Sequence, residues 1–381
     1  MKILIVSPVG EDVHIRKIPA ALRARGAAEV TVIAPERSAT ETAYEASGWR
    51  TVTPGENSNG GRLVTLPLVD PRDGHAGFKN AALKRVIQEA QPDVIQMWGG
   101  APARSAEQVV WLKMRACPRA KTVFYGFDQL PYRFAPLTQL KWKFLWSRMA
   151  GGIEANSEGV EALRQAGFRK PLEQIFWGIS TEEFHPLERA GLRERLGFGN
   201  EKLVGYVGRF VSEKGLSELL AALRQLPSEV HGVLIGAGPM QEELEREAVT
   251  PELRGRVRFL PTMTPEKLVE YMNCFDALAL PSRTTPHWKE QYGRVIGEAM
   301  ACGVVVVGSD SGAIPEVIGE AGLVVRERDT AELARGLECA IFDEVLRARL
   351  IPAGKKRAEE ELSIRAMSGK LMDFYKRLSN A

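Results

Sequence analysis

The 381-residue chain is poor in the residues that build metal centres and disulfide frameworks. It has four cysteines, and none of them forms a CxxC pair, which argues against a cysteine zinc site and against a disulfide scaffold. Its five histidines are scattered along the chain. No run approaches the ~20 apolar residues that a membrane-spanning helix needs. These absences favour a protein of a reducing compartment with ordinary thiols.

The charge balance is nearly even. The chain has 51 Lys and Arg against 48 Asp and Glu, and the net charge of +3 is too small to argue for a nucleic acid partner. Its length predicts two or three domains, at roughly 150 residues each. The opening residues MKILIVSPVG carry a charge and an apolar run, as a signal peptide does. The run is short and ends at Pro8 and Gly10, so it favours a first β-strand.

Short apolar runs alternate with helical patterns, and the series starts again halfway along the chain. Expected strands cover residues 2–8, 30–35, 63–68, 93–98, 121–127 and 152–157, and then 202–209, 232–238, 257–261, 277–282, 304–310 and 322–325. Helical patterns such as those at 80–90 and 215–226 lie between them. Alternation of this kind predicts an α/β protein with two doubly wound parallel sheets, each covered on both faces.

The join between the halves is expected in the charged, turn-rich residues 177–197. We place the first domain at 1–182 and the second at 183–365. Residues 366–381 form a last helix and tail that is expected to cross back to the N-terminal domain. Open α/β sheets bind ligands outside the carboxyl ends of their strands, so two such domains would face a central cleft.

The first candidate site follows the strand at 202–209, in GYVGRFVSEKG. Glycines there let the backbone approach a ligand, and Arg209 and Lys214 could grip one diphosphate. The alternative is that both are solvated loop charges. The glycines of GAGPMQEEL resemble a dinucleotide fingerprint, but Gln241 stands where its third glycine should be, so a nicotinamide or flavin site is poorly supported. The loop within 256–268 could receive a flat base or be an ordinary connection.

The second candidate site is EQYGRVIGE, with Glu290 and Glu298 on either side of Gly293. A helix that starts near Gly293 would offer unpaired first-turn amides to a phosphate or a sugar hydroxyl. Glu290 would lie in the loop before this helix and Glu298 about a turn and a half inside it. Carboxylates accept hydrogen bonds from vicinal hydroxyls. The pattern suits a ligand that is anionic in its middle and hydroxyl-rich at both ends, which is the shape of a nucleotide-sugar.

Several motifs in order resemble those of the family 4 glycosyltransferases, also called glycosyl transferases group 1. They are GYVGRFVSEKG, LPSRTTPHWK, EQYGRVIGE and AMACGVVVVGSDSGAIPEVI, and the resemblance is strongest from 202 to 325. It implies the GT-B fold, with two Rossmann-like domains, and transfer with retention from a nucleoside-diphosphate-sugar to a hydroxyl of a glycan, lipid-linked or small-molecule acceptor. It also implies that no metal or other cofactor is needed, and the chain has no DxD triplet. The alternatives are a GT-B epimerase, a phosphorylase-like enzyme, or a binding protein without turnover.

The resemblance implies roles for individual residues on the donor side. Arg209 and Lys214 match the cations that neutralise the donor diphosphate. Glu298 matches the carboxylate that holds the ribose, and Glu290 the one near the transferred sugar. The remaining donor-side candidates are Gly10, Gln291, Tyr292, Gly293 and Arg294, of which Gly10 would approach the diphosphate from the other domain.

The acceptor side departs from the family. Many relatives carry a histidine after the strand that here reads TVFYGFDQL, where this chain has Phe127 and Asp128, followed by Gln129. Asp128 could orient an acceptor hydroxyl, and is then a catalytic candidate, or it could cap a helix. His14 opens the first helical pattern, where it could touch phosphate or acceptor or lie on the helix surface.

Residues 136–150 interleave aromatic and basic side chains, in PLTQLKWKFLWSRMA. This segment could lie in a membrane interface and bring the enzyme to a lipid-linked acceptor. Alternatively, its broad apolar arc belongs partly to the core. We expect a cytoplasmic protein, with peripheral contact at the inner face of the cell membrane as the alternative.

Overall fold

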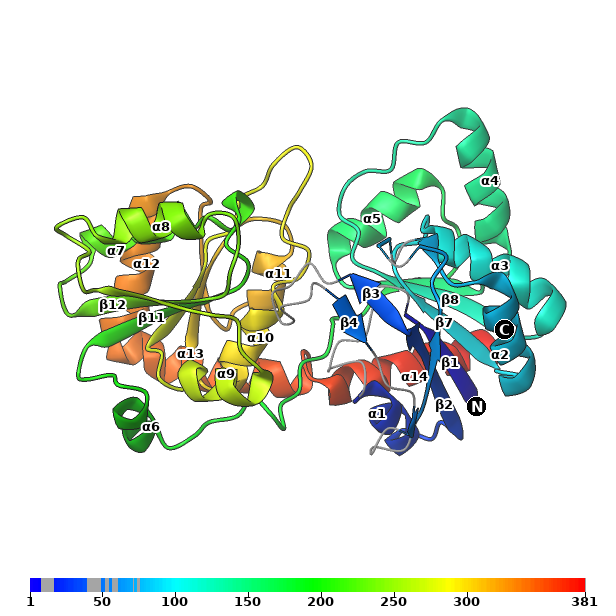
Figure 1. Cartoon of the computed structure of the whole chain (residues 1–381), viewed down its shortest axis with the longest axis horizontal. Coiled ribbons are helices and arrows are strands. Elements are labelled where there is room, and N and C mark those ends of the chain that lie inside the picture. The colour runs from blue at the N-terminus through cyan, green and yellow to red at the C-terminus, as the bar shows by residue number, and fades with distance from the viewer. Residues whose placement is uncertain are drawn as a thin grey trace. The chain divides into compact units, whose positions relative to one another are not determined.

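The computed structural model describes residues 1–7, 17–39, 49–51, 55–56, 61–70, 72–73 and 76–380. They form two compact units, Met1–Gly178 with Ile364–Ala381, and Ile179–Ser363. The boundaries expected from the sequence, after residues 182 and 365, lie slightly further along the chain. Figure 1 shows that each unit is built around one twisted sheet.

The sheet of the first unit has the strand order β10-β9-β8-β7-β1-β2-β6-β5. Neighbouring strands are parallel except β5 and β6. The strands are β1 (Lys2–Val6), β2 (Glu29–Pro35), β5 (Gly55–Glu56), β6 (Arg62–Leu66), β7 (Val94–Trp98), β8 (Lys121–Gly126), β9 (Gly151–Glu154) and β10 (Leu172–Gln174), and β3 (Arg37–Ala39) pairs separately with β4 (Trp49–Thr51). The strand order reverses between β1 and β7, which makes this the switch point of the sheet.

The helices of the first unit cover both faces of its sheet (Figure 1). They are α1 (Ile18–Ala24), α2 (Asn80–Ala90), α3 (Arg104–Ala116), α4 (Pro136–Ser147), α5 (Ser157–Ala166) and α14 (Ile364–Asn380). Helices α2 to α5 close one core, which contains Val109, Trp146 and Leu163. Helices α1 and α14 pack together, and the Tyr375 hydroxyl of α14 donates to the Gln96 side chain of β7.

The sheet of the second unit is parallel throughout, with the order β13-β12-β11-β14-β15-β16. Its strands are β11 (Lys202–Val207), β12 (Val230–Ile235), β13 (Val257–Leu260), β14 (Ala277–Leu280), β15 (Val305–Ser309) and β16 (Leu323–Val325). The first strand along the chain, β11, lies in the middle beside β14. The crevice between the loops that follow β11 and β14 is therefore the switch point, where such sheets bind ligands.

The second unit has helices on both faces of its sheet as well (Figure 1). They are α6 (Arg189–Arg195), the 3₁₀ turn η2 (Ser212–Lys214), α7 (Leu216–Gln225), α8 (Gln241–Ala248), α9 (Pro265–Met272), α10 (Arg294–Ala301), α11 (Ile314–Ile318), α12 (Thr330–Phe342) and α13 (Glu344–Glu360). Helices α7, α8 and α12 pack together, and so do α10, α11 and α13. Among the described helices, none combines the length and the apolar character needed to cross a bilayer.

The predicted α/β architecture with two parallel sheets is confirmed, but several predicted strands are too long. The strand expected at 152–157 ends at Glu154, so the prediction was wrong for its last residues. Asn156 leaves the sheet because its side chain caps α5, where Oδ1 accepts the Gly159 N–H at 2.7 Å. Residues after the strands form the loops that carry polar side chains.

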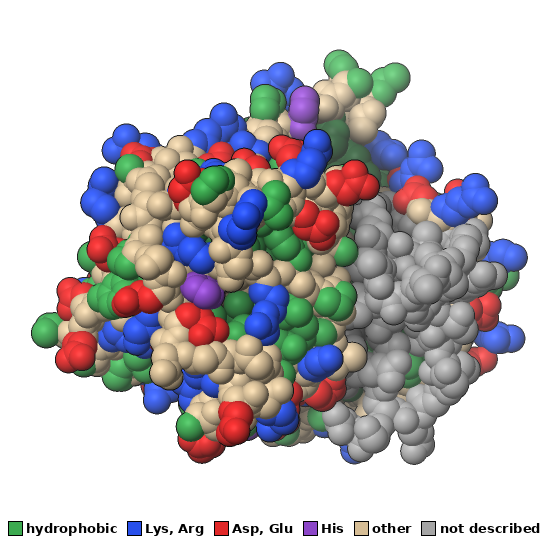
Figure 2. All heavy atoms as spheres, turned by 60° about the vertical axis from the view of Figure 1, so that its left-hand side comes forward, with side chains coloured by type: hydrophobic (Ala, Val, Ile, Leu, Met, Phe, Trp, Pro, Cys, Tyr) green, Lys and Arg blue, Asp and Glu red, His purple; other side chains and the backbone are tan. Residues whose placement is uncertain are grey.

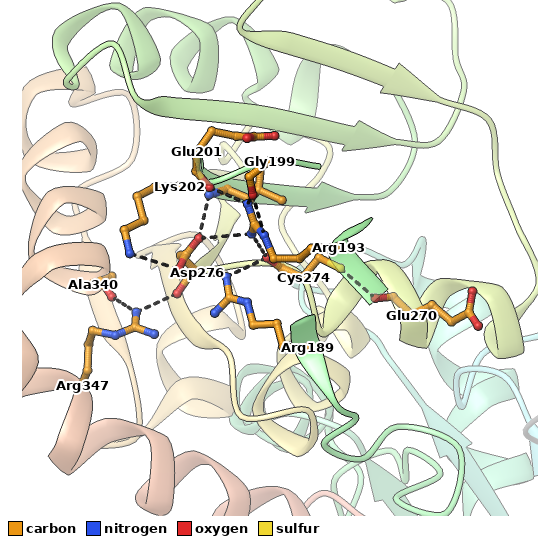
Figure 3. A network of polar contacts seen from close by, with 11 residues as sticks. Arg189, Arg193, Gly199, Glu201, Lys202, Glu270, Cys274, Asp276, Ala340 and Arg347 are labelled. Carbon is orange, nitrogen blue, oxygen red and sulfur yellow. Dashed lines mark hydrogen bonds and ion pairs between the residues drawn. The ribbon is translucent and has the colours of Figure 1, made fainter. Parts of the chain in front are cut away.

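A buried carboxylate fastens the amino ends of β11 and β14 to their neighbours (Figure 3). Asp276 is 4% exposed, and its Oδ2 accepts the Leu203 N–H at 2.8 Å. Its Oδ1 lies 2.9 Å from an Arg189 nitrogen of α6, and its backbone carbonyl accepts from Arg347 of α13 at 2.9 Å. Lys202 lies 3.9 Å away. This cluster joins two helices to the sheet at the edge opposite the switch point.

We expect Asp276→Ala to destabilise the second unit by about 3 kcal/mol, because it removes one partner of a buried ionic cluster and leaves the Leu203 N–H without an acceptor. Urea unfolding measures this loss. Glu338→Ala, at an exposed position of α12, is the control and should change the midpoint little. Equal midpoints for the two variants would contradict the role of Asp276.

Candidate active site

The candidate site lies at the carboxyl ends of β11 and β14. Lys214 belongs to η2, which follows β11, and Glu290 belongs to the loop that follows β14. Lys214 Nζ and Glu290 Oε2 form an ion pair at 2.5 Å, with only 14% and 7% of the two side chains exposed. The Ser282 hydroxyl donates to the same Glu290 oxygen at 2.8 Å. The topology thus brings together two side chains that are 76 residues apart in the sequence.

The backbone around Lys214 is fixed by close contacts. Gly215 has φ +67°, and a Cβ atom there would lie 1.9 Å from the Pro281 carbonyl oxygen, so glycine is required for η2 to lie against the end of β14. Arg283 holds the same turn from the other loop. Its backbone N–H donates to the Glu213 carbonyl at 2.7 Å, and its Nε donates to the Ser212 carbonyl at 2.8 Å.

An aromatic ring and a hydroxyl pair complete the surroundings of Lys214. Its Nζ lies 4.9 Å from the centroid of the Trp288 ring, a cation–π contact that holds the ammonium group. The Thr284 and Ser311 hydroxyls lie 3.1 Å apart at the ends of β14 and β15. The Thr284 N–H donates to the Glu327 carboxylate. The carboxyl edge of the sheet therefore carries the nearly buried ammonium group of Lys214 and several hydroxyl groups.

Helix α10 begins at the predicted place. Gly293 is its N-cap with φ +75°, a conformation that glycine adopts without strain. Glu298 lies on the buried side of the helix, 4% exposed, and its Oε1 is 3.1 Å from Arg294 Nε one turn earlier. Glu290 precedes the helix, and its backbone carbonyl accepts the Ala313 N–H at 2.9 Å. Tyr292 is buried and Gln291 exposed between them.

Arg209 follows β11 on the exposed side of the same edge. The hydroxyl of the buried Tyr206 donates to the Arg209 carbonyl at 2.9 Å and fixes this backbone. Burial, and then the charge of Glu290, raises the pKa of Tyr206 well above its ordinary value. Tyr206 is thus a neutral hydrogen-bond donor underneath the site. Arg209 and Lys214 leave the same strand end, as the sequence predicted.

The acceptor-side candidates belong to the first unit. Asp128 is half-buried and Gln129 is buried in the loop after β8, and Asp128 caps no described helix, since the N-cap of α4 is Ala135. Gly10 and His14 lie outside the described residues, so their roles stay predictions. Within the described chain, no group of three or more His, Cys, Asp and Glu side chains is arranged as a metal site.

Ser282, Arg283 and Trp288 also hold the site; the sequence placed them in the motif LPSRTTPHWK but gave none of them a role. The available signal was their position directly after a strand, at the functional edge of a parallel sheet. The arrangement can neutralise an anion with Lys214 and Arg209, and it can offer carboxylates and helix amides to hydroxyl groups.

Most of the second unit resembles a known family of enzymes. Residues 189–357 match the family model of the glycosyl transferases group 1. The chain is 26% identical over 362 residues to a GDP-mannose-dependent alpha-(1-6)-phosphatidylinositol monomannoside mannosyltransferase of Mycobacterium tuberculosis. That alignment covers 91% of this chain and 89% of the mycobacterial protein. It is 34% identical over 179 residues to a D-inositol 3-phosphate glycosyltransferase of Nocardia farcinica, which covers 44% of this chain and 39% of that protein. Residues 189–357 thus match the group 1 glycosyltransferases, and the chain is similar over most of its length to a glycosyltransferase.

Solved structures of other proteins show the fold of this glycosyltransferase. Sucrose-phosphate synthase from Thermosynechococcus elongatus aligns over 99% of both chains with a TM-score of 0.74 and 19% identity. The HepE protein of Anabaena, solved in complex with UDP, aligns over 99% of this chain and 100% of that one, with a TM-score of 0.74 and 21% identity. The predicted GT-B fold and the predicted enzyme class are confirmed.

We expect Gly215→Ala to destabilise the glycosyltransferase more than Gly255→Ala does. Gly255 has a similar φ of +76° but open space around it, so its substitution reports backbone strain alone, about 1 kcal/mol. At Gly215 the added methyl group also meets the Pro281 carbonyl, and the loss should be at least about twice as large. Thermal unfolding measures both. Equal losses would show that η2 can move away from β14.

Proposed function

We propose that this enzyme transfers a hexose from a nucleoside-diphosphate-sugar to a hydroxyl acceptor, with retention of anomeric configuration and without a metal ion. The observation that supports this best is the nearly buried ammonium group of Lys214 at the switch point. Lys214 is shielded from solvent, next to the helix whose first-turn amides can receive a phosphate. Such a site suits a diphosphate that gains charge as it leaves.

The proposed catalysis is electrostatic. When the bond between the sugar and the diphosphate breaks, negative charge grows on the leaving oxygen. Lys214 and Arg209 would stabilise that charge, and the effect of Lys214 would be the larger because its side chain is shielded from solvent, whereas Arg209 is exposed. Glu298 would hold the ribose and Glu290 the transferred sugar, with the backbone of 291–294 between them. Asp128 of the first unit would orient the acceptor hydroxyl.

We propose GDP-mannose as the donor and a lipid-linked or inositol-containing acceptor. The support comes from the activities of two relatives, the mannosyltransferases of Mycobacterium tuberculosis and Corynebacterium glutamicum, both GDP-mannose-dependent. The first of them acts on a phosphatidylinositol monomannoside. An acceptor of that kind lies in a membrane surface, so we propose in addition that the enzyme contacts the bilayer through α4.

Helix α4 has one buried and one exposed apolar face. Trp142, Leu145 and Trp146 are buried in the core. Leu137 and Leu140, by contrast, are 84% and 67% exposed. The alternative that the segment belongs partly to the core is confirmed, and the exposed leucines support the proposed membrane contact.

An aromatic pair extends the exposed face of α4. Phe144 and Trp111 of α3 are 39% and 40% exposed, and their ring centroids lie 5.7 Å apart. Together with Leu137 and Leu140 they form an apolar stripe. Exposed apolar side chains of this size, gathered on two neighbouring helices, suit insertion into an interface.

The charge around this stripe favours an anionic bilayer. Helix α4 and its C-cap carry the basic residues Lys141, Lys143 and Arg148 and no acidic residue, and Lys141 pairs with Glu107 of α3 at 2.8 Å. On the face of the molecule in Figure 2, by contrast, basic and acidic side chains are interspersed, as on an ordinary protein surface. Basic residues beside an apolar stripe bind anionic headgroups.

A thermal-shift screen of GDP, UDP, ADP and TDP in EDTA tests the donor site. We expect GDP to raise the melting temperature most, because a ligand at ~100 times its dissociation constant adds about 2.7 kcal/mol of stability. Lys214→Ala should abolish the shift and lower kcat/KM for GDP-mannose about 10²-fold or more. Transfer that persists in EDTA supports metal independence, and NMR of the product's anomeric centre reports retention. The proposal would be contradicted if none of the nucleotides shifted the melting temperature, or if Lys214→Ala kept both the shift and the activity.

Sedimentation with lipid vesicles tests the membrane contact. We expect binding to vesicles of phosphatidylcholine with about 30% phosphatidylglycerol, weakened by salt, and little binding without the anionic lipid. Replacing Leu137 and Leu140 by Gln should reduce the bound fraction about fivefold or more. Val345→Gln is the matched control, since Val345 is 83% exposed on α13 of the other unit. Equal binding by the double variant and the control would refute a contact through α4.

A further inference from the structure

A second buried carboxyl group lies at the functional edge of the first sheet and has no part in the mechanism above. Glu154 is the last residue of β9 and is fully buried. It lies opposite Gly126 of β8 in the register of the sheet. The loop that begins directly after Gly126 carries Asp128, so the two carboxyl groups share the carboxyl ends of neighbouring strands.

The chain leaves room for this pair by placing glycines around it. A Cβ atom at Gly126 would lie 2.3 Å from Glu154 Oε1, and one at Gly159 of α5 would lie 2.8 Å from Glu154 Oε2. A Cβ atom at Gly100, after β7, would lie 1.9 Å from Asp128 Oδ2. The Asp128 carboxylate is thus packed against the loop after β7, beside the switch point of this sheet.

Glu154 holds the backbone of the Asp128 loop. Its Oε2 accepts the Asp128 N–H at 3.2 Å. Its Oε1 is buried and forms no hydrogen bond, and none of the Lys, Arg or His side chains of the described residues forms an ion pair with Glu154. A fully buried carboxylate without a cation is expensive, whereas a neutral acid at the same place costs far less.

The charged state follows from these surroundings. Among the described residues, the titratable groups that face Glu154 are Asp128 and Tyr132, both from the segment after β8. Helix α5 faces Glu154 with Gly159, which has no titratable side chain. Burial, and then the charge of Asp128, raises the pKa of Glu154 well above its ordinary value. Burial, and then the same charge, raises the pKa of Tyr132, so the phenol stays neutral.

We propose that Glu154 is a positioning residue of the acceptor side: as a neutral acid beneath the loop, it holds the Asp128 backbone without adding a second negative charge beside the Asp128 carboxyl group. The acceptor assignment rests on the proposed function. The hydrogen bond and the neutral state of Glu154 do not, and they can be tested without any substrate.

Amide hydrogen exchange of the full chain at Asp128 tests the hydrogen bond. Glu154→Gln keeps an oxygen that accepts the Asp128 N–H, and Glu154→Leu keeps the volume but removes the acceptor. We expect wild-type exchange in the Gln variant and exchange about tenfold faster in the Leu variant, since one hydrogen bond contributes about 1.4 kcal/mol or less. Unchanged exchange in Glu154→Leu would overturn the positioning role.

The pH dependence of the melting temperature tests the neutral state. A carboxyl group whose pKa is raised by folding adds stability below its unfolded pKa, about 4.3, and loses it as the pH rises through the folded pKa. Gln cannot ionise, so Glu154→Gln should not share this loss. The melting temperature of the variant minus that of wild type should be higher at about pH 8 than at about pH 5, by about 2–4 °C or more. A difference in melting temperature between the two proteins that stays constant over this pH range would show that Glu154 is ionised in the fold and would overturn the neutral state.

The link to the acceptor is tested last, with GDP-mannose and phosphatidylinositol monomannoside in mixed micelles. Glu154→Leu should raise KM for the lipid about fivefold and leave the GDP thermal shift unchanged, while Glu154→Gln should resemble wild type. A raised KM for GDP-mannose instead would overturn the acceptor-side assignment. If wild type transfers nothing to this lipid, the proposed function fails, and the exchange and melting data still decide the state of Glu154.

Discussion

The ion pair between Lys214 and Glu290 joins the two loops on which the candidate active site depends. It is nearly buried, and burying two charges costs desolvation energy that their attraction repays only in good geometry. The surrounding residues supply that geometry: Ser282 donates to the carboxylate, Trp288 covers the ammonium group, and Gly215 lets the turn reach β14. In the proposed mechanism a donor diphosphate would offer Lys214 a second anion, and the resting pair would keep the cation in place until substrate arrives.

The two edges of the second sheet divide stability from function. At the amino edge, Asp276 is surrounded by Arg189, Arg347 and Lys202, and its contacts fasten helices to the strands. At the carboxyl edge, polar groups remain near the surface in loops that close contacts hold in place. Charged clusters occur at both edges, but only one coincides with the switch point, and this position distinguishes a binding site from a structural cluster.

The sequence predicted the alternation of strands and helices, the family, and the places of Glu290 and Glu298 around α10, because these follow from local periodicity and motif spacing. It could not predict that Ser282 and Lys214 meet on one oxygen of Glu290, since this contact depends on the packing of two loops far apart in the sequence. Glu154 was missed for a related reason. A single glutamate at the end of an apolar run resembles a solvated strand end until the sheet places Asp128 beside it.

The structure of the enzyme crystallised with GDP tests the central claim most directly. The account predicts the diphosphate at the carboxyl ends of β11 and β14, with Lys214 Nζ on a phosphate oxygen, Arg209 beside it and the ribose within reach of Glu298. Nucleotide bound elsewhere, for example at the switch point between β1 and β7, with the Lys214–Glu290 pair untouched, would contradict it.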